Sequence, residues 1–147
     1  MATRSTIAIQ NADGTVTGIY CHWDGGFWHV GPTLLEHYTS EQLVRELISF
    51  GDISSLGERI HPAEGGDHSF SKPEKGVTVF YGRDRGEKNI DAQTYDNWDA
   101  LLRSNGQAYN YLFKPATGFL APTPAKWIVD VGGSRGDLKQ AIELENA

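Results

Sequence analysis

The chain has 147 residues, of which 39% are hydrophobic and 22% are charged, and its formal net charge at pH 7 is −6. This length favours one domain that buries a core without disulfides or metal ions. No apolar run approaches the ~20 residues needed to cross a bilayer, and no signal peptide is recognisable, so we expect neither membrane insertion nor export. The acidic charge argues against binding to duplex nucleic acid. The single cysteine, Cys21, excludes an internal disulfide and a cysteine-based zinc cluster.

An antiparallel hairpin is expected at the start of the chain. Residues 4–10 alternate between apolar and polar side chains, and residues 11–14, Asn-Ala-Asp-Gly, are typical of a tight turn. The second strand is expected over residues 16–23. Because side chains alternate along a strand, Cys21 and Trp23 are predicted to face the core.

Two helical segments follow in the sequence. Thr33 and Glu36 have capping-box spacing in a short helical turn. Thr39 repeats this start signal for a longer helix, whose apolar residues share one face until Phe50 and Gly51 end it.

The second half of the chain predicts alternating strands, helices and long loops. Residues 51–76 are expected to form a surface excursion with one possible turn of helix at 54–58. The elements expected after it are a strand at 76–81, a helix capped by Thr94, strands at 109–114 and 127–131, and a short helix from Asp137.

These elements predict one α+β domain over residues 1–147. We expect an antiparallel or mixed sheet with an N-terminal hairpin and two to three helices packed on one face. The segments 61–75 and 115–124 are expected to be long loops, and 132–147 a tail with a possible short helix.

The first candidate cluster for chemistry lies at the end of the second strand. Tyr20, His22 and Asp24 are expected to point to one side, beside Trp23, just before a turn made by two glycines. Such a strand end is a good platform for a polar ligand. In the alternative interpretation, His22 and Asp24 pair locally while Cys21 and Trp23 pack in the core.

The second candidate cluster is Arg83, Asp84 and Arg85, placed between glycines where the 76–81 strand ends. Glycines permit close backbone approach, and arginine donates to phosphate or carboxylate through two parallel bonds. We therefore expect an anionic ligand here. The alternative is a surface turn whose charges pair with one another.

No catalytic or metal-binding motif is recognisable. The loop 61–75 contains histidines and acids that could bind a metal or close over a ligand, but a mobile solvated loop is favoured. We predict no catalytic residues, no metal and no cofactor.

Several separate motifs resemble a family of small uncharacterised proteins of tailed bacteriophages and prophages. The similarity covers roughly residues 3–114, although Gly26 stands where family members usually carry Tyr. It is carried by residues 3–5 (Thr-Arg-Ser), 19–25 (Ile-Tyr-Cys-His-Trp-Asp-Gly), 34–38 (Leu-Leu-Glu-His-Tyr), 51–58 (Gly-Asp-Ile-Ser-Ser-Leu-Gly-Glu) and 81–87 (Tyr-Gly-Arg-Asp-Arg-Gly-Glu).

The resemblance implies a product that acts in the cytoplasm of an infected bacterium. By analogy with small phage accessory proteins, we expect a non-catalytic binder that sequesters a nucleotide-like, phosphate-bearing messenger of host defence. Arg83 and Arg85 would then hold phosphates, Tyr20 or Trp23 would stack on a base, and Asp24 or Asp84 would accept from hydroxyls or amines.

Two other functions are left open by the sequence. The protein could inhibit a host defence protein directly through an acidic, aromatic surface. It could also hydrolyse a nucleotide or phosphoester, with His22 as base or metal ligand beside Asp24. A chain of this size has little room to engulf a nucleotide, so we expect a homo-oligomer.

Overall fold

The computed structural model describes residues 2–146, which form one eight-stranded mixed sheet and five α-helices. The expected α+β class is thereby confirmed. The strands are β1 (Ser5–Gln10), β2 (Val16–Cys21), β3 (Ile53–Ser55), β4 (Val79–Phe80), β5 (Gln93–Tyr95), β6 (Tyr109–Lys114), β7 (Lys126–Val131) and β8 (Ser134–Asp137). The helices are α1 (Val30–His37), α2 (Glu41–Ser49), α3 (Tyr81–Arg85), α4 (Trp98–Asn105) and α5 (Leu138–Glu145).

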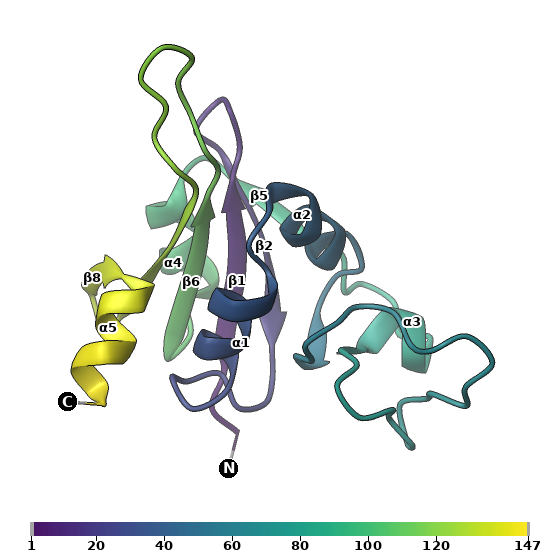
Figure 1. Ribbon diagram of the computed structural model, residues 1–147. Helices are drawn as coiled ribbons and strands as arrows, with labels where there is room; N and C mark the ends of the chain where they lie inside the picture. The colour runs from purple at the N-terminus through teal and green to yellow at the C-terminus, as the bar shows by residue number, and fades with distance from the viewer. Residues whose placement is uncertain (1, 147) are drawn as a thin grey trace.

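The N-terminal hairpin lies in the middle of the sheet. The strand order is β4-β3-β2-β1-β6-β7-β8, and β5 pairs with β2 outside this path. β1 is antiparallel to β2, as expected, and parallel to β6, with Ile7 opposite Tyr111. The sheet is therefore mixed, and its central strand has partners on both edges (Figure 1).

Both faces of the sheet are covered, which corrects the expectation that helices pack on one face only. Ile7 and Ile9 lie in the larger core, with buried residues of α1, α2 and α5. Ala8 points to the opposite face, where it packs with Trp98 and Leu101 of α4 in a second, smaller core. Figure 1 shows α1 and α2 in front of the sheet and α4 behind it. The alternation along β1 thus creates two cores because both of its faces are apolar.

Several expected boundaries are wrong because a local side chain ends or starts an element elsewhere. The expected strand at 76–81 shortens to β4, and the chain turns directly into α3. Asn97, rather than Thr94, caps α4 by accepting from the Ala100 amide at 2.8 Å, which leaves Thr94 within β5. The predicted tail contains β8 and α5, whose N-cap is Asp137.

The predicted core face of β2 is correct for Cys21 and wrong for Trp23. Cys21 is fully buried, and burial raises the pKa of its thiol to about 12. Trp23 lies after the strand ends and is 44% exposed. The alternation fails there because it applies only while the backbone stays extended.

Two long loops are confirmed. Residues 61–75 contain no helix or strand, and neither do residues 115–124. The second loop extends the β6–β7 hairpin well beyond the end of the sheet (Figure 1).

Substituting Leu101→Ala tests the second core. Leu101 is buried between α4 and the sheet, so the cavity left by its side chain should lower the free energy of unfolding by about 3 kcal/mol. Urea unfolding measures this change. The control Leu43→Ala makes the same truncation at an exposed position on α2 and should cost less than about 1 kcal/mol. Equal losses in both variants would contradict the packing of α4 on the sheet.

Candidate functional site

The candidate site begins at a fork on the outer edge of β2. At one end of this edge, Val16 to Gly18 pair with the antiparallel β5. At the other end, Cys21 pairs with Ile53 of the parallel β3. β3 and β5 therefore diverge from a shared edge and leave a notch between them.

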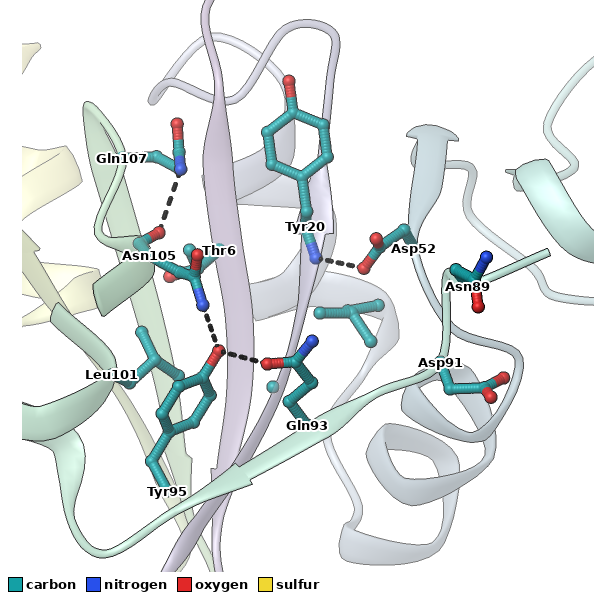
Figure 2. Close-up of a pocket in the computed structure, with 12 residues that line it drawn as sticks. Thr6, Tyr20, Asp52, Asn89, Asp91, Gln93, Tyr95, Leu101, Asn105 and Gln107 are labelled. Carbon is teal, nitrogen blue, oxygen red and sulfur yellow. Dashed lines mark hydrogen bonds between the residues drawn. The ribbon is translucent and has the colours of Figure 1, made fainter. Parts of the chain in front are cut away.

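A carboxylate fills the gap in the hydrogen-bond ladder at this fork. The backbone amide of Tyr20 donates to Oδ1 of Asp52 at 2.9 Å (Figure 2). Asp52 is itself held by its backbone, since its amide donates to the carbonyl of Ile90 at 2.8 Å. An unpaired strand amide is costly, so the Asp52 side chain stabilises the place where the two strands part.

A pocket of about 250 Å³ lies at this notch, on the face of the sheet that carries α4. Gly18 is part of its floor, and a Cβ there would lie only 2.8 Å from Leu101 of α4. The glycine therefore allows α4 to approach the sheet. Much of the remaining wall is polar and comes from the segment before and within β5 and from the end of α4, namely Asn89, Asp91, Gln93, Tyr95, Asn105 and Gln107.

A chain of hydrogen bonds orders one wall of the pocket. Asn105 Nδ2 donates to the Tyr95 hydroxyl, which donates in turn to Gln93 Oε1 at 3.3 Å (Figure 2). Gln107 Nε2 donates to the Asn105 carbonyl at 2.9 Å. Within residues 2–146, no hydrogen bond engages the Gln93 amide nitrogen or the side chains of Asn89 and Asp91. These groups are available to a ligand.

The pocket is electronegative. Burial raises the pKa of Asp52, and the nearby carboxylates of Glu87 and Asp91 raise it further, against the opposing effect of the Tyr20 amide. The residues that line the pocket include no lysine or arginine. Negative charge is therefore concentrated here without a local counter-ion.

The first predicted cluster is partly assembled beside this pocket. The Tyr20 hydroxyl and His22 Nδ1 are 2.7 Å apart, and the rings of His22 and Trp23 are nearly perpendicular, with their centroids 4.6 Å apart. Asp24 turns away from them. It has a left-handed backbone with φ of 55°, and its carboxylate lies 3.5 Å from the indole nitrogen of Trp28.

The local pairing of His22 with Asp24, which was the alternative interpretation, does not form among the described residues. Of the residues predicted to bind a ligand, Tyr20 lines the pocket and the others lie outside its wall. His22 and Trp23 nevertheless directly follow the end of β2, close to the pocket residue Tyr20.

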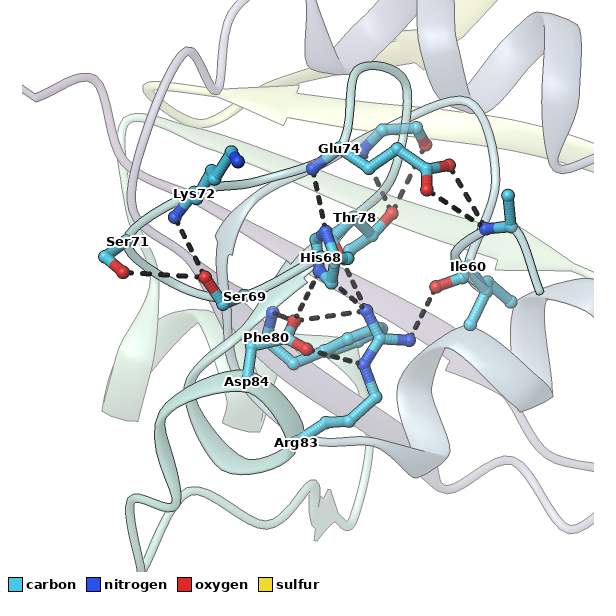
Figure 3. A network of polar contacts seen from close by, with 12 residues as sticks. Ile60, His68, Ser69, Ser71, Lys72, Glu74, Thr78, Phe80, Arg83 and Asp84 are labelled. Carbon is cyan, nitrogen blue, oxygen red and sulfur yellow. Dashed lines mark hydrogen bonds and ion pairs between the residues drawn. The ribbon is translucent and has the colours of Figure 1, made fainter. Parts of the chain in front are cut away.

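The second predicted cluster forms an internal clamp (Figure 3). Arg83 donates to the carbonyls of Ile60 at 2.6 Å and Thr78 at 2.9 Å. Its Nε donates to Asp84 Oδ1 at 2.9 Å. The carboxylate of Asp84 also accepts from the Phe80 amide at 2.8 Å. The guanidinium of Arg83 thus binds backbone and carboxylate groups of the protein itself.

His68 connects this clamp to the long loop 61–75. The Glu74 amide donates to Nδ1 of His68 at 2.9 Å, which identifies Nδ1 as the unprotonated nitrogen. The opposite nitrogen, Nε2, is 3.2 Å from Asp84 Oδ2 and can donate to it. The side chains of His68 and Asp84 are only 2% and 6% exposed. The loop is therefore fixed at a buried histidine, rather than free as expected.

The pKa of Asp84 reflects this environment. Burial alone would raise it, but hydrogen bonds from Arg83, the Phe80 amide and His68 outweigh burial and lower the pKa overall. Asp84 is therefore held as a buried, fully bonded carboxylate.

Arg85 differs from Arg83 because its side chain is accessible. It lies over the ring of Phe70 at 5.0 Å, and its Nε is 3.9 Å from Glu87 Oε2. The two neighbouring arginines point to different surroundings and do not form a joint phosphate clamp in this structure.

Most of the pocket wall was missed by sequence reasoning, although a signal is present. Asn89, Asp91, Gln93 and Tyr95 occupy every second position, which is the spacing of side chains on one side of an extended segment. This alternation was overlooked because Thr94 was interpreted as the N-cap of a helix, whereas it lies within β5. Asp52 carried no comparable signal, because it acts through a backbone amide 32 residues away.

Among residues 2–146, no group of three or more His, Cys, Asp or Glu side chains is placed to hold a metal ion. None of the helices in this range is long and apolar enough to cross a membrane. Comparisons with protein-family models, curated proteins and solved structures find no match to this chain.

Substituting Asp84→Ala tests the clamp. The variant leaves the largely buried guanidinium of Arg83 without its charge partner, so we expect a loss of about 3 kcal/mol in unfolding free energy. Hydrogen exchange of the Glu74 amide should accelerate because His68 loses its support. The control Asp67→Ala removes an exposed loop carboxylate, which pairs with Lys72, and should change stability by less than about 1 kcal/mol. A clamp variant as stable as this control would show that the network contributes nothing.

Substituting Asp52→Asn tests the electronegative notch through its pH dependence. The pKa of Asp52 is raised in the folded state, so the folded protein binds this proton more tightly than the unfolded chain does. Stability contributed by the protonated form is present below the ordinary pKa of 3.8 and is lost as the pH rises through the higher folded value. Asn keeps an acceptor for the Tyr20 amide and has no charge. Its stability relative to the original protein should therefore increase between pH 3 and pH 7, as measured by urea unfolding at each pH. A difference that stays constant with pH would contradict this account.

Proposed function

We propose that this protein is a non-catalytic binder of a small polar molecule of nucleoside size, which enters the pocket between β2, β5 and α4 by an uncharged or cationic end. The observation that carries the proposal is the composition of the pocket wall. It combines the carboxylates of Asp52 and Asp91 with several side-chain amides and contains no cationic residue.

The size of the pocket supports a small ligand. Its volume of about 250 Å³ is below the roughly 300–1,000 Å³ of sites for drug-sized molecules. One sugar or one nucleoside suits this space, whereas a dinucleotide does not. About 20 heavy atoms at about 0.3 kcal/mol each give roughly −6 kcal/mol, which corresponds to a dissociation constant of tens of micromolar.

The hydrogen-bonding groups of the wall suit hydroxyls and base edges. Carboxylates accept from hydroxyl and amino groups, while Asn and Gln amides both donate and accept, as they do on adenine. The rings of Tyr20 and Tyr95 border the same space and supply apolar surface. A ribose or a base would therefore find partners on several sides.

The charge of the pocket disfavours a phosphate inside it. A phosphate about 5 Å from one carboxylate would be repelled by about 3 kcal/mol at an effective dielectric constant of 20. The proposed site therefore differs from the phosphate clamp that the sequence predicted at Arg83 and Arg85. The donors of Arg83 already bind Ile60, Thr78 and Asp84. A nucleotide would place its nucleoside part in the pocket and its phosphates toward solvent.

The biological setting of the proposal rests on the resemblance to phage proteins. In that setting, the ligand would be a nucleotide messenger of host defence that the protein withdraws from the host cytoplasm. The direct inhibition of a host protein and the hydrolysis of a phosphoester are the alternatives that the same experiment separates.

Equilibrium dialysis against the common nucleosides and their 5′-monophosphates tests the proposal. At least one nucleoside should bind, and its monophosphate should bind no more tightly, because the phosphate gains no cationic partner in the pocket. Gln93→Ala removes a pocket amide and should weaken binding about tenfold. The control Thr94→Ala changes the next residue, which lies outside the pocket wall, and should leave the affinity unchanged.

Each other outcome has a distinct meaning. If the monophosphate binds more tightly, and if affinity is retained in Gln93→Ala but lost in Arg85→Ala, the ligand binds at Arg85 and not in the pocket. A new chemical species in the chromatographed dialysate would identify an enzyme. The absence of binding to every compound would reject the proposal.

A further inference from the structure

The segment between β6 and β7 presents two large apolar side chains to solvent. We call residues 115–124 the arm; it extends beyond the sheet (Figure 1). At its tip, Phe119 and Leu120 are 94% and 92% exposed. Exposed apolar clusters on a soluble chain are typical of interaction sites, because their burial contributes much of the free energy of association.

The arm has a defined shape that holds this tip outward. Thr117 and Thr123 exchange two backbone hydrogen bonds, at 3.0 and 2.6 Å, which close the arm below the tip. Gly118 has φ of +92°, and a Cβ at this position would lie 2.8 Å from the carbonyl oxygen of Ala121. The turn therefore requires glycine, and the exposure of the neighbouring Phe119 follows from the turn.

An apolar groove of about 500 Å³ lies where β7, β8 and α5 meet. This volume is twice that of the polar pocket. Its apolar lining comes from Phe27, Val129, Val131, Ala141 and Leu144, and Leu144 is 77% exposed. The groove is open on the side that faces away from the core, so it can accept side chains from another molecule.

The arm and the groove lie at opposite ends of β7, so the arm is directed away from its own groove. Lys126 begins β7 at the base of the arm, whereas Val131 ends β7 inside the groove. A two-fold axis that passes beside β7, midway between the tip and the groove of one copy, places each tip at the groove of the other copy. Such an arrangement uses both features twice, as closed dimers do.

Charge on the two features is complementary. Lys114 and Lys126 are exposed and lie directly opposite each other at the base of the arm, and no acidic residue lies between them in the sequence. Glu41 of α2 borders the pocket that these lysines line at the base of the arm but is paired with Arg45, and like charges directly opposite each other are unfavourable without a partner. The groove is bordered by Asp137 and Glu145, and the guanidinium of the nearby Arg135 is already paired with Asp99 and Asp130.

We propose that two copies of this chain associate by reciprocal insertion of the Phe119–Leu120 tip into the partner's groove between β7 and α5. The lysines at the arm base then approach acidic residues at the groove rim. This association is separate from the polar pocket on the α4 face, so it does not depend on the proposed ligand.

Light scattering after size exclusion, combined with sedimentation velocity over a concentration series, tests the association. The unmodified chain should have about twice the monomer mass of 16.2 kDa. Phe119→Ser with Leu120→Ser (the arm variant) and Leu144→Lys (the groove variant) should each raise the dissociation constant at least about 30-fold. The control Leu43→Ser changes an exposed leucine of α2 that lines neither the groove nor the pocket at the base of the arm, and it should remain dimeric.

Mixing the two variants provides the decisive result, because one arm and one groove are intact in the mixture. The arm variant and the groove variant, each monomeric alone, should form a one-to-one complex. Failure to form this complex, or a dimer that withstands both substitutions, would overturn the proposal. A monomer whose tip instead mediates co-sedimentation with phosphatidylcholine–phosphatidylglycerol vesicles would also overturn it, and would assign the arm to a membrane surface.

Discussion

The hydrogen bond from the Tyr20 amide to Asp52 allows two strands of opposite direction to share one edge of β2. β1 occupies the other edge of β2, so the antiparallel β5 and the parallel β3 each pair with a different part of the remaining edge. A strand amide between two diverging partners would be left without an acceptor, and the partly buried Asp52 carboxylate supplies one. The fork, the notch and the pocket all follow from this arrangement, since the pocket occupies the space that the diverging strands leave.

The two candidate regions use their polar groups in opposite ways. In the clamp, Arg83, Asp84 and His68 meet one another and the backbone, and their hydrogen-bonding capacity is directed inward. In the pocket, the polar groups converge on open space, and some have no partner within residues 2–146. A buried, satisfied network stabilises a loop, whereas convergent groups around an accessible volume are suited to binding. The fork therefore has the features of a binding site, and the clamp has those of a structural element.

The parts of the fold that were predictable from sequence depend on local patterns. Alternation predicted β1, strand signals predicted β6 with both bounds correct, and Asp137 marked the start of α5. β3 was missed because three residues within a glycine-rich stretch carry no measurable periodicity. The roles of Arg83 and Asp52 were unpredictable for a different reason. Each depends on partners far away in sequence, and whether a polar side chain faces solvent or a buried acceptor is decided by topology.

The parallel pairing of β1 with β6 has a consequence for how the chain reaches its fold. Ser5 pairs with Tyr109, so the central strand acquires its second neighbour only when residues 104 positions later are present. Closing so long a segment is entropically costly and is associated with slow folding. During synthesis, β1 can pair only with β2 until β6 has left the ribosome, so the apolar residues on both faces of β1 stay incompletely covered. The early chain thus spends this interval with an unpaired central edge, the stage at which assistance from a chaperone would matter most.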